Sequence, residues 1–243
     1  MIVVKYGGSA LDDPGLETLL HEVRQLDAVL VHGGGPEISR LTKRLDLPSR
    51  FVDGLRVTDA DTLAVAQMVL CGRINKQLVA RLGSRAVGVS GIDGGVFACS
   101  RLSESLGFVG KIERVETKLI RTLSQAGFLP VVAPLGVGPD GTCYNLNADT
   151  AAAELAVALQ ASRLVYLTDV PGVLCRGRLL HRLSVSEADR MIATGEATGG
   201  MIPKLRACQA AARFGVPAQI VLAGTSLHSD GGTLMTPDLP AAA

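Results

Sequence analysis

Two glycine-rich turns give this sequence its clearest potential for binding an anion. Lys5 ends the first apolar run of the chain, and a pair of glycines that includes Gly8 follows shortly after it. A second apolar run ends at His32 and continues into a Gly-Gly-Gly-Pro turn that contains Gly34 and Gly35. Glycines expose backbone N–H groups, and a helix N-terminus adds a favourable dipole, so such turns suit phosphate or carboxylate groups. A lysine at the carboxyl end of a strand stands where α/β proteins bind ligands.

Four other polar side chains stand at the expected ends of strands and helices. Arg56 lies just before a helix start, where a guanidinium can hold a carboxylate with two hydrogen bonds; a solvated loop arginine is the alternative. Asn145 also precedes a helix, and Asp169 ends a strand. Lys204 lies in the first turn of a helix, where a cation opposes the helix dipole, so we expect an anionic group to compensate it.

Neither common nucleotide-binding signature is present. The chain lacks the Gly-Lys-Ser/Thr ending of a P-loop and a proper Gly-x-Gly-x-x-Gly pattern, so a kinase would need another phosphate cradle. His-Gly-Gly-Gly also serves as an esterase oxyanion hole, but that fold requires a Gly-x-Ser-x-Gly elbow. The nearest stretch, residues 88–91, has the wrong spacing. A serine hydrolase is therefore disfavoured.

Composition excludes several other classes of protein. The 243 residues are 47% hydrophobic and include 28 glycines, as in a compact α/β enzyme. A net charge of +1, no basic stripe, and only three tyrosines and five phenylalanines argue against nucleic-acid binding. The five cysteines are widely spaced without a C-x-x-C, which disfavours a disulfide framework or zinc site and favours a reducing compartment. With a strand at the first residues and no bilayer-length apolar run, we expect a cytoplasmic protein without a membrane partner.

The elements that position these side chains alternate along the chain. Runs rich in β-branched residues predict strands at 2–4, 28–31, 86–89, 129–133, 164–168 and 219–222. Helical patterns fall between them, at roughly 14–25, 36–46, 59–82, 116–126, 148–160, 186–194 and 201–214. Continuous apolar strands separated by helices predict a mostly parallel sheet covered on both faces. Residues 95–114 predict an inserted hairpin, and 136–141 is the best candidate for a joint between two lobes.

The predicted helix 59–82 has two unusual features. Its start, Thr58-Asp59-Ala60-Asp61, resembles a capping box with Asp in place of Glu. Its first half is apolar on nearly every side, so it must be buried on more than one face. One face can meet the sheet and the other a second subunit, which predicts a homodimer. The alternative is a central helix within one large core.

Taken together, these segments resemble the amino acid kinase superfamily and, within it, the N-acetyl-L-glutamate kinase family. The resemblance runs from residue 2 to about 222 and rests on Lys-Tyr-Gly-Gly-Ser, His-Gly-Gly-Gly-Pro, Phe-Val-Asp-Gly-Leu-Arg-Val-Thr-Asp, Asn75-Lys76, Asn-Leu-Asn-Ala-Asp and Thr-Gly-Gly-Met-Ile-Pro-Lys. Aspartate, carbamate and uridylate kinases share single motifs, whereas the ordered set is more specific. The resemblance implies a three-layer αβα sandwich in two lobes. Residues 1–138 would bind the acyl amino acid and dimerise, and residues 139–243 would bind ATP.

The implied reaction is ATP-dependent phosphorylation of the γ-carboxylate of N-acetyl-L-glutamate to N-acetyl-L-glutamyl 5-phosphate, in arginine biosynthesis. By resemblance, Lys5 and Lys204 flank the transferring phosphoryl group and Asp149 holds both lysines. The N–H groups of the matched glycines would cradle the phosphate and the attacking carboxylate: Gly8, Gly34 and Gly35. A carboxylate nucleophile is already ionised at neutral pH, so no general base is required.

The resemblance also implies how the two substrates are held. Arg56 and Asn145 would bind the α-carboxylate of acetylglutamate, whereas Asp169 and Lys204 would lie near the nucleotide. The magnesium ion that accompanies ATP would be held mainly by its phosphates, so no metal ligand is assigned to the protein. The partners are then two small molecules and a second copy of the chain.

The chain departs from arginine-inhibited, hexameric relatives in two places. It begins at the first strand, without their N-terminal helix, and the segment 223–232 is much shorter than the corresponding segment of those relatives. We therefore expect no arginine inhibition. Two alternatives stay open: a carrier-protein-linked aminoadipate or glutamate kinase of lysine biosynthesis, and a non-catalytic metabolite-binding regulator on the same fold. The presence of both lysines and Asp149 speaks against a regulator.

Overall fold

The computed structural model of the chain, which describes residues 1–7 and 15–237, is built around an eight-stranded sheet. The pair β15–β16 is antiparallel, and the other neighbouring pairs are parallel. The strands follow the spatial order β14 (Arg182–Ser184), β16 (Thr233–Thr236), β15 (Ala218–Leu222), β11 (Arg163–Thr168), β1 (Ile2–Tyr6), β2 (Ala28–His32), β8 (Leu129–Ala133) and β5 (Ala86–Ser90). The six strands predicted from the sequence are all confirmed.

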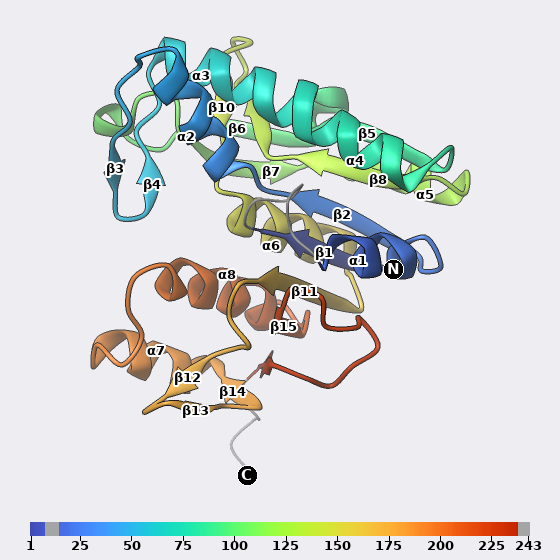
Figure 1. The fold of residues 1–243 in the computed structure, drawn as a ribbon, viewed down its shortest axis with the longest axis vertical. Coiled ribbons are helices and arrows are strands. Elements are labelled where there is room, and N and C mark those ends of the chain that lie inside the picture. Colours follow the sequence, from blue (N-terminus) through green and yellow to red (C-terminus); the bar gives the residue numbers. More distant parts are fainter. Residues whose placement is uncertain (8–14, 238–243) are drawn as a thin grey trace.

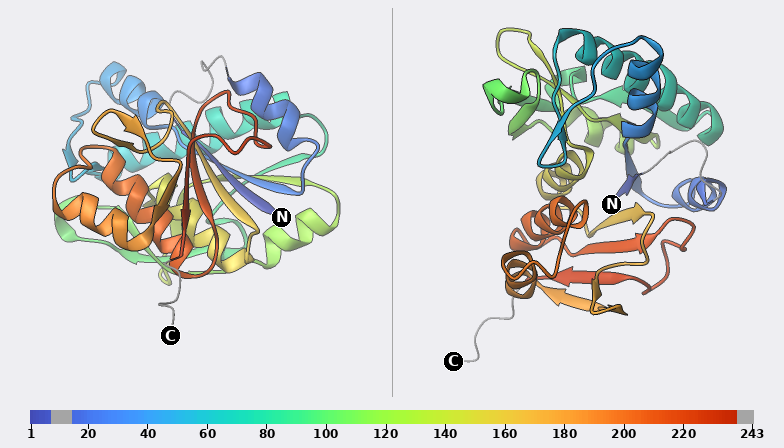
Figure 2. Two further views of the ribbon diagram at one scale, coloured as in Figure 1. Left: turned by 90° about the horizontal axis from the view of Figure 1, so that it is seen from below. Right: turned by 60° about the vertical axis from the view of Figure 1, so that its left-hand side comes forward.

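Helices connect the strands and cover the sheet, as the alternating pattern predicted. They are α1 (Leu16–Val23), α2 (Gly35–Arg44), α3 (Ala60–Gln67), α4 (Asn75–Leu82), α5 (Lys118–Gln125), α6 (Ala148–Leu159), α7 (Val185–Ala193) and α8 (Met201–Arg213). In Figure 1 the first half of the chain (blue to green) and its last third (orange to red) form two stacked parts. The right-hand view of Figure 2 shows the same stacking, and β1 pairs with β11 where the two parts meet.

The sheet separates two hydrophobic cores. Successive strand residues point to opposite faces. Val3 therefore packs in the core that contains Leu155 of α6 and Ala211 of α8, whereas Val4 packs in the core that contains Leu20 of α1. Because both faces are buried, these strands read as continuous apolar runs. The predicted three-layer αβα arrangement is confirmed.

The predicted helix 59–82 is continuous but changes its winding. Between α3 and α4 lies a π-helical segment, η1 (Met68–Ile74). The capping-box prediction was wrong. Asp59, in extended conformation, is the N-cap, and its carboxylate accepts a hydrogen bond from the Thr62 N–H at 2.8 Å. The Thr58 hydroxyl instead donates to the Arg56 carbonyl.

A four-stranded sheet and two hairpins complete the fold. The small sheet has the order β10 (Cys143–Asn145), β9 (Leu135–Val137), β6 (Phe97–Arg101) and β7 (Gly110–Val115), which confirms the hairpin predicted at 95–114. Residues 136–141, predicted as a joint between lobes, lie in β9 and in the turn that joins it to β10, and these two strands pair directly. The two hairpins, which the sequence pattern did not reveal, are β3 (Phe51–Val52) with β4 (Leu55–Arg56) and β12 (Leu174–Cys175) with β13 (Arg178–Leu179). Short 3-10 turns lie at Asp93–Gly95 and Glu104–Leu106.

Candidate active site

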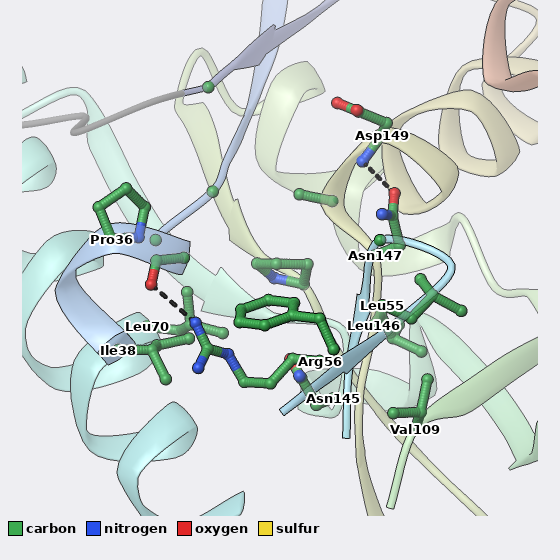
Figure 3. Close-up of a pocket in the computed structure, with 18 of the residues that line it drawn as sticks. Pro36, Ile38, Leu55, Arg56, Leu70, Val109, Asn145, Leu146, Asn147 and Asp149 are labelled. Carbon is green, nitrogen blue, oxygen red and sulfur yellow. Dashed lines mark hydrogen bonds between the residues drawn. The ribbon is translucent and has the colours of Figure 1, made fainter. Parts of the chain in front are cut away.

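A pocket of about 210 Å³ lies at the carboxyl ends of the central strands β1 and β2. The glycine turn after β2, the hairpin β3–β4 and the first turn of α6 enclose it. Figure 3 shows Arg56 reaching across toward the start of α2, with Asn147 and Asp149 on the first turn of α6. In doubly wound sheets, ligands bind outside this edge of the strands.

The structure brings most of the predicted site residues to this pocket. Six of them line it: Lys5, Gly34, Gly35, Arg56, Asn145 and Asp149. Lys204 joins them through an ion pair with Asp149. Asp169 is not among the lining residues; it is exposed, and its carboxylate accepts a hydrogen bond from the Thr168 hydroxyl. Gly8 lies outside the described residues.

Asp149 is held between two lysines. Its Oδ1 lies 2.6 Å from Nζ of Lys5, and its Oδ2 lies 3.1 Å from Nζ of Lys204. Asp149 and Lys5 are both buried, and burial by itself would raise the pKa of the carboxyl. The two ammonium groups outweigh that effect, so the pKa of Asp149 lies below its ordinary value. Asp149 is therefore the anion that we expected to compensate Lys204.

The first turn of α6 places Asp149 between these lysines. Asn147 caps the helix, since its Oδ1 accepts hydrogen bonds from the N–H groups of Asp149 and Thr150 at 2.9 and 3.0 Å. From β11, the fully buried Tyr166 donates its hydroxyl to the Asp149 carbonyl oxygen at 2.9 Å. Tyr166 pairs with Lys5 in the register of β1 and β11. Sequence analysis missed Tyr166, because a tyrosine inside an apolar strand looks like ordinary core.

In the glycine turn between β2 and α2, Gly34 has little room for a side chain, whereas a Cβ at Gly35 would meet nothing within 4 Å. A Cβ at Gly34 would lie 2.5 Å from Cδ1 of Ile74 and 2.7 Å from Cδ2 of Leu70. The φ of Gly34 is 175°, outside the left-handed region, so its need for glycine arises from this close packing. The Gly33 N–H donates to the Tyr6 carbonyl at 2.9 Å, which ties the turn to the end of β1.

Arg56 is buried and holds the hairpin β3–β4 against α2. Its guanidinium donates to the Gly35 carbonyl oxygen at 2.9 Å and to the hydroxyls of Ser39 and Ser49 at 2.7 and 2.9 Å. The Phe51 ring lies 4.6 Å from the guanidinium carbon. Burial lowers the pKa of Arg56 from its ordinary value. No carboxylate of the described residues pairs with it, and two of its five N–H donors stay available to a ligand.

Asn145, the last residue of β10, lies beside Arg56. Its backbone N–H donates to the Phe108 carbonyl at 2.9 Å, and its side-chain amide donates to the Thr58 hydroxyl at 3.2 Å. Figure 3 shows Asn145 and Arg56 next to each other on the wall opposite Asp149. One side of the pocket thus offers hydrogen-bond donors for a carboxylate, and the other side offers ammonium groups.

This arrangement can bind an anion and stabilise the negative charge that develops during transfer of an anionic group. The donors are ammonium, guanidinium, amide and backbone N–H groups fixed by the fold. No group of three or more His, Cys, Asp or Glu converges as a metal site anywhere in residues 1–7 and 15–237. Within the same ranges, no helix is long and apolar enough to cross a membrane.

Comparison with known proteins points to one family. Residues 1–222 match the model of the amino acid kinase family. An acetylglutamate kinase from Geobacillus kaustophilus is 45% identical over 240 residues, covering 96% of this chain and 93% of the relative. Among solved structures, a protein from Streptococcus mutans superposes with a TM-score of 0.87 at 29% identity, covering 98% of both chains. An N-acetylglutamate synthase from Neisseria gonorrhoeae, complexed with coenzyme A and N-acetyl-glutamate, superposes with a TM-score of 0.85 at 27% identity; this chain spans 59% of its length.

Proposed function

Because the chain belongs to the amino acid kinase family, we propose that it transfers the γ-phosphoryl group of ATP to the γ-carboxylate of N-acetyl-L-glutamate. The product is N-acetyl-L-glutamyl 5-phosphate, as in arginine biosynthesis. The relatives named acetylglutamate kinase, which align over nearly the whole chain, support this substrate. The observation that carries the proposal is the Lys5–Asp149–Lys204 cluster, whose buried members Lys5 and Asp149 line the same pocket as Arg56 and Asn145.

The two lysines act on the transferring phosphoryl group. Its charge is spread over three oxygens in the transition state, and catalysis depends on positioning and charge stabilisation. Lys5 approaches from the end of β1 and Lys204 from the first turn of α8. Asp149 forms ion pairs with both ammonium groups and so holds them at a fixed separation. The attacking carboxylate is ionised at neutral pH and needs no general base.

The first half of the chain, residues 1–138, holds the acyl amino acid together with Asn145. The remaining donors of Arg56 and the amide of Asn145 bind the α-carboxylate. The N–H groups of Gly34 and Gly35 face the γ-carboxylate and the phosphoryl oxygens. The five-donor fork of arginine and the start of α2 are both suited to anions.

Residues 139–243 hold ATP. Lys204 contacts its phosphates, and Asp169, exposed at the end of β11, lies near the nucleotide. Magnesium enters with ATP and is held mainly by the phosphates. The relevant compartment is the cytoplasm, and the enzyme is a homodimer whose subunits meet along α3 and η1. Support for the dimer comes from the outer side of this helix, where Met68 is 55% exposed and Ala60 and Ala64 are exposed too.

The test is formation of an acyl phosphate from ATP. The purified protein is incubated with MgATP, hydroxylamine and one acceptor, and the hydroxamate that forms from the acyl phosphate is measured with ADP release. We expect N-acetyl-L-glutamate to give equal amounts of both products, and glutamate and aminoadipate to give far less. A preference for a carrier-linked acceptor would establish the lysine-pathway alternative. Tight binding of acetylglutamate without any ADP release would establish the regulator.

A further inference from the structure

A buried polar network lies directly behind the glycine turn. His32 is fully buried at the end of β2, and Asn75, at the start of α4, is 1% exposed. The Asn75 amide nitrogen lies 2.9 Å from the Val131 carbonyl oxygen and 3.3 Å from both the Val89 carbonyl oxygen and Nε2 of His32. Asn75 thus joins β2, β5 and β8 through one side chain.

These contacts define the protonation of the imidazole. The Asn75 Oδ1 faces Nζ of Lys76 at 3.1 Å, so the NH₂ group of the amide faces the carbonyls and His32. Because an NH₂ group only donates, Nε2 of His32 accepts, and in the neutral ring the hydrogen must then be on Nδ1. Nδ1 lies 2.9 Å from the Gly33 carbonyl oxygen and donates to it. Asn75 therefore selects the tautomer that lets His32 hold Gly33.

Holding the Gly33 carbonyl also orients the next N–H group. The Gly33 C=O and the Gly34 N–H belong to the same planar trans peptide, so they point in opposite directions. The Gly33 N–H is held as well, by the Tyr6 carbonyl, and Gly34 packs against Leu70 and Ile74 of η1. With its oxygen bound behind the turn by His32, this peptide presents its N–H on the opposite side, and Gly34 lines the pocket.

We propose that His32 and Asn75 are positioning residues that aim the Gly34 N–H at the anionic group undergoing phosphoryl transfer. Neither side chain lines the pocket, and both act through the Gly33–Gly34 peptide. The inference rests on the proposed function, because it gives the aimed N–H a role in charge stabilisation. Its structural part, the tautomer of His32, does not depend on activity.

The first test is made on the unmodified protein at neutral pH. Long-range ¹H–¹⁵N NMR spectra distinguish the two neutral imidazole tautomers, and the His32 signals are identified by their loss in His32→Asn. The chain has only three other histidines, His21, His181 and His228. We expect the hydrogen on Nδ1 of His32. A hydrogen on Nε2 would overturn the proposal, whether or not the protein phosphorylates acetylglutamate.

The second test compares two substitutions of His32. In His32→Asn the amide nitrogen takes the place of Nδ1 and can still donate to Gly33, whereas the amide of His32→Gln lies one bond further out. Both variants remove ring volume from the core, so similar losses of thermal stability are expected. We expect kcat to fall by about tenfold or more in His32→Gln, less than for outright loss of a donor. His32→Asn should stay within about threefold of the unmodified protein, and KM for ATP should change little in both.

The outcomes separate positioning from general destabilisation. Equal losses of kcat in the two variants, or an unchanged kcat in His32→Gln, would overturn the positioning role. If the unmodified protein forms no acyl phosphate with any acceptor, the proposed function fails. The NMR experiment then still decides the tautomer.

Discussion

Among single side chains, Lys5 and Lys204 carry the most specific expectation. Each ammonium group lies within 3.1 Å of an Asp149 oxygen and is fixed before substrate binds. Lys5→Met or Lys204→Met removes one preorganised charge from the transition state. We expect kcat to fall by about 10²–10³-fold in either variant, measured by steady-state ADP release. Lys118→Met, on the exposed start of α5, serves as the control. A near-normal kcat would remove that lysine from the mechanism.

Arg56 should act mainly in binding the acyl amino acid. Its planar fork donates to Gly35, Ser39 and Ser49 and still offers donors to a ligand. A lysine keeps the charge but cannot make these contacts together. In Arg56→Lys we expect KM for acetylglutamate to rise by about tenfold or more, while KM for ATP changes little. If the ATP value shifts instead, the assignment of the two substrates to the two halves of the chain is reversed.

His32 should make the stability of the protein depend on pH in the acidic range. Burial lowers its pKa from 6.5 to about 4, since a buried imidazolium loses its hydration. Between these values the unfolded chain binds a proton that the folded chain excludes, so the free energy of unfolding falls as the pH falls. Between pH 7 and pH 4 we expect the free energy of unfolding to fall by about 3 kcal/mol more in the unmodified protein than in His32→Asn. Urea unfolding at both pH values measures the free energy of unfolding of each protein. An equal fall in the two proteins would show that the folded state does not lower the pKa of His32.

At the level of elements, the helix formed by α3, η1 and α4 connects the site to the outer surface. Leu70 and Ile74 of η1 pack against Gly34, and Asn75 follows immediately. π-helical turns within α-helices often occur at functional sites. Here the turn shifts side chains around the helix, so that Leu70, Ile74 and Asn75 are all buried behind the glycine turn while Met68 stays on the outside.

The exposed side of this helix predicts the subunit contact. In a twofold interface the same surface patch of both subunits is in contact, so a single substitution places two altered side chains in the interface. We expect the unmodified protein to be a dimer at micromolar concentration and Met68→Glu to be a monomer, both measured by light scattering. Gln125→Glu, which adds the same charge on the exposed end of α5, should remain dimeric. A monomeric unmodified protein would contradict the homodimer directly.

For the molecule as a whole, the segment 223–232 bears on regulation. It contains no helix, and its own contacts hold it to the rest of the fold. The Leu227 N–H donates to the Glu22 carboxylate at 2.6 Å, and the Gln219 amide donates to the carbonyls of Ser229 and Gly231 at 3.1 and 2.7 Å. Arg163 also donates to the Leu227 carbonyl oxygen. The segment thus forms a short closed loop beside β15.

We expect the enzyme to be insensitive to arginine. Feedback inhibition requires a second site whose occupation favours a less active state. By resemblance, such a site uses the C-terminal segment, which is short here and held by hydrogen bonds to Glu22, Arg163 and Gln219. Activity is measured with and without millimolar arginine at subsaturating acetylglutamate. Saturable inhibition would show that the loop, with His228 and Asp230, still binds the effector.

Much of this architecture is determined by local patterns. The β-branched runs predict six of the eight strands of the large sheet, because a parallel strand buried on both faces must be apolar throughout. Lys5 and Gly34 could be located because the ends of such strands converge on one edge of the sheet. The ordered motifs also pointed to Asp149 as the partner of both lysines, and the ion pairs agree with that prediction.

Only the tertiary structure decided how these residues are held, because the groups that hold them are far apart in sequence. Asp149 and Lys204 are 55 residues apart, and Asn75 and His32 are 43 apart. Hydrogen bonds between residues so far apart produce no periodic pattern or fixed spacing that could be recognised in the sequence. Tyr166 looks like core and Asn75 like a helix residue until the sheet places one beneath Asp149 and the other behind Gly33. The sequence by itself therefore determined most of the polar residues that reach the pocket, and the packing of distant elements decided how their donors are directed.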